Sequence, residues 1–429
     1  MKRTLLRAAT SLWLIVLVAL GARIGFAWNQ ERKIRREVLG IVPFQQETGN
    51  IAYSLVQGKG YSNPYRRDTG ATAWLTPVYP FLIAIIFKIF GVETIAAFFA
   101  AVFLNSLFSA AACLPIYFSG KRIAGVGVAS AAAWLWALLP NAVMFPFEWI
   151  WDTSLSALLA ATLLWATLAL AESTRLRDWC AYGLLWGFTL MTNPSLGSLL
   201  PFLLGWAAFR VCRRRNVRLG KPALALVLAI LCCVPWTMRN YLVFHKFIPL
   251  RSNLGLELYI GNNENYDPQS PRWPPPVTRE REIQRFFKMG EIPFMEEEMR
   301  KATRFIVTHP GVELKLIGLR IVAFWMGTPT PLKDFLETDS LLIKTVFVCN
   351  FLATLGALVG NVVLYRRRNP FAFPVAVFPV VFPVLYYVTN TSLRYRHNID
   401  PVVLLLLAVA ASWPGVFVAK SQPSESALT

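Results

Sequence analysis

Ten long apolar segments constrain this chain more than any other feature of its sequence. An α-helix rises about 1.5 Å per residue, so about 20 residues cross the roughly 30 Å hydrocarbon core of a bilayer. Of the 429 residues, 55% are hydrophobic and only 16% are charged, whereas a soluble domain carries about 25% charged residues. The pattern predicts an all-α polytopic membrane protein of about ten transmembrane helices. It excludes a soluble enzyme, a secreted disulfide scaffold and a disordered chain. The expected spans are 9–28, 95–118, 123–143, 153–171, 178–192, 195–211, 222–238, 341–364, 370–388 and 399–418.

The distribution of positive charge predicts how these segments are oriented. The formal net charge is +19, but many of the 43 Lys and Arg residues lie in short loops between apolar segments. That is the positive-inside pattern of membrane proteins, so we expect contact with membrane lipids and no nucleic acid. The segment 77–90 is too short to cross the bilayer, and as an interfacial or re-entrant helix it leaves the basic loops on the side of the N-terminus. We therefore expect a multi-pass protein of the cell (inner) membrane, with an uncleaved first span and both termini cytoplasmic.

Two long polar segments, 29–94 and 239–340, then lie outside the membrane. Loops of this length are uncommon in compact proteins unless they carry function. The second segment contains helical periodicity that predicts amphipathic helices on the membrane surface. The expected parts are an N-terminal membrane domain that includes the first outer segment, the second outer segment, C-terminal transmembrane helices and a short tail. Their boundaries are 1–238, 239–340, 341–420 and 421–429.

Three acidic residues of the outer segments and turns are candidate catalytic groups. Glu47 begins a short predicted helix, where a carboxylate either stabilises the helix N-terminus or acts as a general base. Glu148 and Asp152 are four residues apart in an outer turn, so on one helix they would share a face. This pair could bind a divalent cation, orient a substrate hydroxyl or pair with arginines, and Asp152 could simply cap the next span. No cofactor is otherwise indicated, and no Cys/His cluster suits a metal ion.

Several basic side chains on the outer side break the positive-inside pattern, which makes them candidate phosphate ligands. A guanidinium group binds phosphate through paired hydrogen bonds. The alternatives are solvated loop charges and interfacial anchoring. The candidates are Arg66, Arg67, Arg239, Arg251, Arg394, Arg396 and His397. The amide groups of Asn262 and Asn263 suit sugar hydroxyls, but they suit plain turns equally well.

The order of these pieces resembles the GT-C class of membrane glycosyltransferases, near the protein O-mannosyltransferase and lipid A aminoarabinose transferase group. The resemblance extends from about residue 10 to 418, and the order of its motifs is more specific than any motif alone. The motifs are Ala52–Tyr61, Pro77–Pro80, the turn with Glu148 and Asp152, Thr192–Ser195, and Arg394–Pro401. One departure concerns the helix at Glu47, which the family commonly starts with an aspartate, whereas Gln45 and Gln46 precede the glutamate here. Asp68 and Asp152 therefore stay open as alternative bases.

The resemblance implies transfer of a hexosyl or pentosyl unit from a polyprenyl-phosphate-linked donor to an acceptor hydroxyl on the outer side, with inversion. Polyprenyl phosphate is a good leaving group, so one carboxylate suffices as base, and arginines stabilise the developing phosphate charge. Glu47 inherits the role of base, the catalytic core is 1–238, and the acceptor is a glycan, a lipid or a protein. Asp68, Tyr61 and Tyr79 join the two asparagines as candidate substrate-binding residues. Two other classes stay open: a transporter or flippase of a lipid-linked or anionic substrate, and a non-catalytic membrane subunit.

Overall fold

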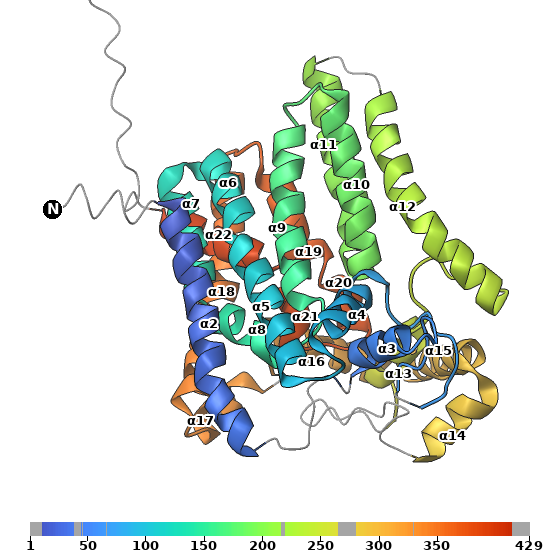
Figure 1. The fold of residues 1–429 in the computed structure, drawn as a ribbon. Coiled ribbons are helices and arrows are strands. Elements are labelled where there is room, and N and C mark those ends of the chain that lie inside the picture. The colour runs from blue at the N-terminus through green and yellow to red at the C-terminus, as the bar shows by residue number, and fades with distance from the viewer. Residues whose placement is uncertain are drawn as a thin grey trace, which may run out of the picture.

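The computed structural model describes residues 11–37, 44, 46–65, 67–215, 219–264, 280–328 and 330–413. Within these ranges the chain is built from helices and connecting turns, and the β-structure is one isolated bridge between Ser62 and Ala71. Long helices stand side by side, and short helices gather across one end of them (Figure 1). The prediction of an all-α fold is confirmed.

The described helices are numbered as in Figure 1. Those up to the second outer segment are α2 (Leu12–Glu37), α3 (Glu47–Val56), α4 (Val78–Phe90), α5 (Ile95–Ala111), α6 (Cys113–Ala124), α7 (Val126–Leu138), α8 (Pro140–Glu148), α9 (Thr153–Leu170), α10 (Leu176–Thr192), the 3-10 helix η1 (Pro194–Leu199), α11 (Leu200–Arg215) and α12 (Gly220–Phe244). Those that follow are α13 (Leu254–Gly261), α14 (Glu280–Met289), α15 (Glu291–Thr308), α16 (Pro310–Met326), α17 (Pro331–Glu337), α18 (Leu341–Arg366), α19 (Ala372–Val381), α20 (Val384–Val388), α21 (Leu393–His397) and α22 (Asp400–Ala411).

In the described part of the chain, six helical stretches are long and apolar enough to cross a membrane: Leu12–Gln30, Ile95–Ala124 (α5 with α6), Thr153–Leu170, Pro194–Arg213 (η1 with α11), Gly220–Phe244 and Leu341–Arg366. The pair α7 and α8, bent by 43°, forms a seventh span if the two helices are counted together. These seven correspond to seven of the ten predicted spans. The other three fall on helices shorter than 18 residues, namely α10, the pair α19–α20, and α22. The predicted span 123–143 corresponds to α7 and α8 together, and the helix bends between them because the ring nitrogen of Pro140 has no hydrogen to donate to the preceding turn. The segment 77–90 holds only the 13-residue α4, as its length predicted.

Small residues let α18 and α22 approach each other closely. Ala353, Gly356, Ala357 and Gly360 recur along one face of α18 and are buried. A Cβ atom on Gly360 would lie only 2.2 Å from the carbonyl oxygen of Leu406 in α22. Lipid tails are as apolar as leucine, so close van der Waals packing of this kind is what holds membrane helices together.

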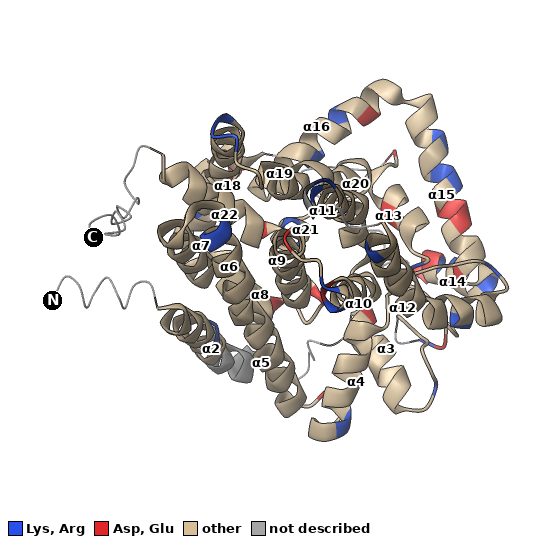
Figure 2. Cartoon of the chain, turned by 90° about the horizontal axis from the view of Figure 1, so that it is seen from above, with Lys and Arg blue, Asp and Glu red and all other residues tan. Residues whose placement is uncertain are grey.

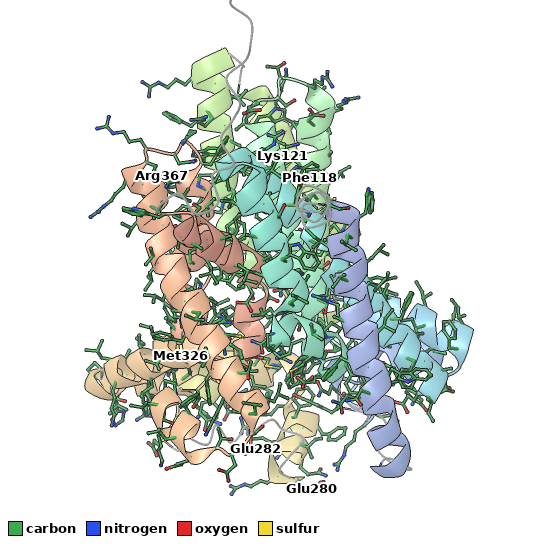
Figure 3. All side chains as sticks on the ribbon, turned by 90° about the vertical axis from the view of Figure 1, so that its left-hand side faces the viewer. Phe118, Lys121, Glu280, Glu282, Met326 and Arg367 are labelled. Atoms are coloured by element: carbon green, nitrogen blue, oxygen red, sulfur yellow. The ribbon has the colours of Figure 1, made fainter. Side chains whose placement is uncertain are left out.

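The basic loops and the outer segments lie at opposite ends of the helices. Figure 3 shows Lys121 and Arg367 at one end and Glu280, Glu282 and Met326 at the other. The helix α2 begins beside α6, whose last turn contains Lys121 (Figure 1). This arrangement agrees with the sorting of segments by charge, and which end faces the cytoplasm stays a prediction.

The two outer segments share a small aromatic core. Tyr65 and Trp74 of the first segment pack in edge-to-face contacts with Phe286 of α14, at ring-centroid distances of 5.4 and 6.4 Å. Phe294 of α15 continues the cluster at 5.2 Å from Phe286. On the outside, α15 carries side chains of both charges (Figure 2). The helices α14 and α15 of the second segment therefore pack aromatic side chains against the first segment and against each other.

A buried carboxylate joins the same two segments. Glu291, in the first turn of α15, accepts hydrogen bonds from the Thr72 hydroxyl at 2.5 Å and the Ala73 amide at 2.8 Å. It also accepts one from the Ser252 hydroxyl at 2.7 Å. One side chain thus satisfies donors from both segments and fixes the chain on either side of the cavity described next.

Candidate active site

A cavity of about 390 Å³, here called the central cavity, lies where the outer segments meet the ends of the membrane helices. Four predicted site residues line it: Glu47, Asp152, Arg251 and Arg394. Glu257, which the sequence did not single out, lines it too. The walls are formed by residues within 47–48, 74–75, 151–153, 193–195, 249–257 and 385–398. The cavity therefore combines segments that are hundreds of residues apart in the sequence.

Glu47 is positioned by the start of α3. The preceding Gln46 is extended, so the helix begins at the glutamate, and the next five residues of the helix are buried. Burial raises the pKa of Glu47, while a hydrogen bond with its own backbone and the charge of Arg394 oppose the rise. A carboxylate with a raised pKa is a stronger base than an ordinary one, which suits proton abstraction near neutral pH.

Glu257 faces the same cavity from the first turn of α13. The side-chain amide of Asn253 donates a hydrogen bond to its carboxyl group at 3.3 Å. Burial raises the pKa of Glu257 to about 7; the neighbouring charge of Glu47 adds to the rise, and Arg394 and Arg251 limit it. Two carboxyl groups whose charges act on each other thus share one cavity with two arginines.

Arg394 is held in place by aromatic rings. Its guanidinium lies 3.4 Å from the ring centroid of Trp151 and 5.0 Å from those of Trp149 and Tyr395. Such stacking fixes a guanidinium plane while leaving its edge for hydrogen bonds. Among the described residues, its buried Nη1 atom has no hydrogen-bond partner, and neither has the buried Nε atom of Arg251. Buried donors of this kind are costly unless a ligand accepts their hydrogen bonds.

Asp152 belongs to a hydrogen-bonded chain at the start of α9. It accepts a hydrogen bond from the Ser156 hydroxyl at 2.9 Å, and the amide of Asn193 donates to that hydroxyl at 3.1 Å. Asn193 in turn caps η1 by accepting from the Ser195 amide at 3.1 Å. Asp152 occupies the N-cap position of α9, but its side chain makes no capping bond to the helix backbone. Its carboxylate is therefore oriented by Ser156 rather than by the helix end.

The expected pairing of Glu148 with Asp152 on one helix face is wrong. Glu148 is the last residue of α8 and α9 begins at Thr153, so the two acids lie on either side of a break. Only Asp152 lines the central cavity. No group of three or more His, Cys, Asp or Glu side chains suited to a metal ion occurs in the described ranges, so the divalent cation stays an untested alternative.

Two predicted phosphate ligands are instead internal ion-pair partners. Arg396 donates to Asp400 at 2.8 Å and to the side-chain oxygen of Asn350 at 2.8 Å. His397 contacts the other oxygen of Asp400 at 3.2 Å, and its ring stacks on Trp136. All three ionisable side chains are essentially inaccessible to solvent. The expectation that Arg396 and His397 bind phosphate is wrong for this structure. Both side chains are buried in the interior, and their polar atoms already contact the carboxylate of Asp400.

The other basic and acidic candidates that the structure describes, Arg67, Arg239 and Asp68, also lie away from the cavity lining. Arg67 is exposed and forms two 3.1 Å hydrogen bonds with Glu280. Arg239 donates to the backbone oxygens of Thr72 at 2.6 Å and Tyr61 at 2.8 Å. Asp68 is exposed and pairs with Lys59 at 3.0 Å. Arg66 lies outside the described residues.

The tyrosine and asparagine candidates stabilise the framework around the cavity. The hydroxyl of Tyr61 donates to the backbone oxygens of Leu75 and Thr76, and that of Tyr79 donates to Asn105 at 2.8 Å. Asn262 and Asn263 are buried and donate to helix carbonyl groups, including that of Val388. The expected direct contact of these four side chains with substrate is not supported, because none of them lines the central cavity.

Sequence reasoning missed Glu257 and Tyr395. One signal was available for the glutamate: it is the only charged residue in the apolar stretch Leu254–Gly261 of the second outer segment. A single charged residue in an apolar helix is costly to bury without a partner, so its presence indicates that it faces a polar cavity. Tyr395 carried no comparable signal, because an aromatic residue in an outer turn is also typical of interfacial anchoring.

Fold and site together define a multi-pass membrane protein with a cavity, at the level of its outer segments, that holds both carboxyl and guanidinium groups. Residues 75–238 match the family model of dolichyl-phosphate-mannose-protein mannosyltransferases. The apo oligosaccharyltransferase of Archaeoglobus fulgidus is 12% identical with a TM-score of 0.54, covering 94% of this chain and 50% of that one. The same enzyme, AglB, in complex with an inhibitory peptide and a dolichol-phosphate, is 14% identical with a TM-score of 0.55, covering 94% of this chain and 49% of that one. ArnT from Cupriavidus metallidurans, bound to undecaprenyl phosphate, is 15% identical with a TM-score of 0.40, covering 93% of this chain and 77% of that one. A comparison with curated protein sequences found no significant match.

The family match and the fold shared with the archaeal oligosaccharyltransferase confirm the resemblance to the GT-C class. The chain spans about half the length of the archaeal oligosaccharyltransferase. At such low identity the likeness establishes the fold, and the chain has the GT-C fold. The matched segment 75–238 contains α4 to most of α12, including Asp152, whereas Glu47, Glu257 and Arg394 lie outside it.

Proposed function

We propose that this chain is a membrane glycosyltransferase that uses a polyprenyl-phosphate-linked sugar and an acceptor hydroxyl outside the inner membrane, with both termini in the cytoplasm. The observation that carries the proposal is the central cavity, where Glu47 faces two arginines with unsatisfied donors. The match to mannosyltransferases and the dolichol-phosphate named in the AglB complex support this class of donor. The acceptor is a glycan, a lipid or a protein hydroxyl.

In the proposed reaction Glu47 is the general base. Its carboxylate accepts the proton of the acceptor hydroxyl as that oxygen forms a bond to the anomeric carbon. The bond from that carbon to the donor phosphate oxygen breaks, and its electron pair leaves with the polyprenyl phosphate. Attack and departure on opposite faces invert the sugar carbon. Because the leaving group needs no proton, the reaction requires no general acid.

Arg251 and Arg394 are the proposed phosphate ligands. Charge accumulates on the phosphate as the glycosidic bond breaks, so preorganised donors stabilise the transition state more than the ground state. The rings of Trp151 and Tyr395 hold Arg394 in place before the donor arrives. Asp152, oriented by Ser156, is proposed to accept a hydrogen bond from a sugar or acceptor hydroxyl.

The test is turnover of a radiolabelled panel of polyprenyl-phosphate sugars by purified protein in detergent. Label should leave the lipid with wild type, and Glu47→Gln should slow this by about 10²- to 10⁴-fold, the usual contribution of a general base. Glu337→Gln is the matched control, because Glu337 is exposed on α17 and pairs only loosely with Lys333 at 4.0 Å. Full activity of Glu47→Gln would remove Glu47 as the base and move the test to Asp152→Asn and Asp68→Asn.

A further inference from the structure

The central cavity has more acidic than basic side chains before any substrate enters. Its lining contains Glu47, Asp152 and Glu257 against Arg251 and Arg394. The donor of the proposed function is a phosphodiester, which adds another negative charge. Negative charges crowded into a cavity partly shielded from water cannot all persist, so one carboxyl group is expected to keep a proton.

The three carboxyl groups are stabilised unequally as anions. Glu47 starts α3 and forms a hydrogen bond with its own backbone, at the helix end that favours negative charge. Asp152 accepts the hydroxyl hydrogen of Ser156. Among the described residues, Glu257 accepts a single hydrogen bond, from the Asn253 amide at 3.3 Å. Of the three, Glu257 has the weakest support for its ionised form.

We propose that Glu257 takes up a proton when the anionic donor binds and donates that hydrogen to a donor oxygen, while Glu47 stays ionised as the base. This inference rests on the proposed function, since it needs a phosphate in the cavity. It gives the two glutamates different tasks: Glu257 is a neutral hydrogen-bond donor to the bound donor molecule, and Glu47 is the proton acceptor. Binding of the donor is then coupled to the uptake of one proton.

The charged and titratable groups around Glu257 show why Glu257, rather than a neighbour, is proposed to take up the proton. The charges of Arg394, Arg251 and Glu47, which line the same cavity, act on Glu257. The phenol of Tyr65 is also close, but burial raises its pKa well above the usual value, so it stays neutral. The same holds for Tyr395, whose pKa burial raises to about 12.

The helix α15, which packs against α13, contributes charged groups that already have partners. Glu291 accepts its three hydrogen bonds from the outer segments. Glu298 pairs with Arg285 and Lys301. Burial lowers the pKa of His397, next to the cavity-lining Asn398, and its ring nitrogen already contacts Asp400 at 3.2 Å. Burial raises the pKa of Glu257 to about 7, close to neutral pH.

Binding of farnesyl methyl phosphate to the detergent-solubilised full chain tests the proposal. This phosphodiester has no ionisation of its own between pH 5 and 9, and it carries no sugar to be transferred. For wild type, a requirement for protonated Glu257 with a pKa of about 7 weakens the affinity about tenfold between pH 6 and pH 8. Calorimetry in two buffers of different ionisation enthalpy should show uptake of about half a proton at pH 7, without any variant.

Two variants assign this proton. Glu257→Gln carries a permanent N–H donor in place of the carboxylic acid, so its affinity should be independent of pH and close to that of wild type at pH 6. Glu47→Gln removes a charge that raises the pKa of Glu257, so the pH midpoint should move downward. The control, Glu337→Gln, should reproduce the wild-type profile.

The outcomes separate this inference from the proposed function. Binding of equal strength at pH 6 and pH 8 in wild type, or an unchanged pH profile in Glu257→Gln, would overturn proton uptake by Glu257 and leave the phosphate site standing. Absence of binding at every pH would overturn the proposed function and this inference with it. A tenfold wild-type dependence that Glu257→Gln abolishes would establish it.

Discussion

Gly261 is the point where α13 touches the turn that carries Arg394, and its replacement by alanine tests whether this contact positions the site. A Cβ atom there would lie 1.8 Å from the carbonyl oxygen of Thr389 and 2.7 Å from the carbonyl carbon. Ordinary contacts begin at 3.4 Å, so helix and turn must separate by about 1.6 Å. Glu257 lies one turn before Gly261, and Arg394 follows Thr389 by five residues.

The junction has little freedom to adjust. Arg320 is buried and donates to the carbonyl oxygen of Gly261 at 2.5 Å and to Val388 at 3.1 Å. Overpacking of this kind costs about 1–3 kcal/mol of stability. A displacement of about 1 Å in a catalytic arrangement can cost on the order of 100-fold in rate. We therefore expect Gly261→Ala to fold with a lower thermal midpoint and to release sugar from the donor about 100-fold more slowly.

The assay is the initial rate at which label leaves the lipid, measured with the thermal midpoint in the same detergent. Gly318→Ala is the control, because a Cβ atom at this α16 position meets nothing within 4 Å. Alanine is a better helix former than glycine by about 0.5–1 kcal/mol, so the control should be as active as wild type and equally or more stable. A wild-type rate and midpoint for Gly261→Ala would refute the reasoning, as would an equal loss in the control.

Three further substitutions probe the framework. Gly360→Ala should lower the free energy of unfolding in detergent by about 1–3 kcal/mol, since its Cβ would meet Leu406 of α22, whereas Gly205→Ala, with open space around it, should not. Asp400→Asn leaves Arg396 buried without a counter-charge and should cost about 3–5 kcal/mol in the same titration. Its control, Arg67→Gln, removes an exposed pair and should change stability by about 1 kcal/mol or less. Glu291→Ala leaves three donors of the outer segments without their acceptor and should speed proteolysis within them; a wild-type cleavage rate would show that this carboxylate does not join the segments.

Hydrophobic patterning predicted most of the membrane helices, because apolar run length directly reflects the thickness of the bilayer. It did not predict the break at Pro140 in the third span. Three predicted spans fall on helices shorter than 18 residues, among them α22, which begins at Asp400 but ends at Ala411, before the predicted end at residue 418.

For the candidate site, the sequence identified residue types but could not say which of them are free to act. Arg394 and Arg396 are two positions apart in the same outer turn. Arg394 lines the cavity between aromatic rings, whereas Arg396 forms an ion pair with Asp400 in the interior. Adjacent side chains of one short helix point in different directions, so only the surroundings distinguish a ligand from an ion-pair partner.

The sequence by itself determined that this is a multi-pass helical membrane protein with two long outer segments, and it placed an acid at the start of a helix at Glu47, because apolar length, charge sorting and helix starts are local properties. Only the tertiary structure decided that Glu257, 210 positions further along the chain, shares a cavity with that acid and with Arg251 and Arg394. A carboxyl group acquires its chemistry from the charges and the degree of burial around it. Those are set by contacts between distant segments, which no local pattern encodes.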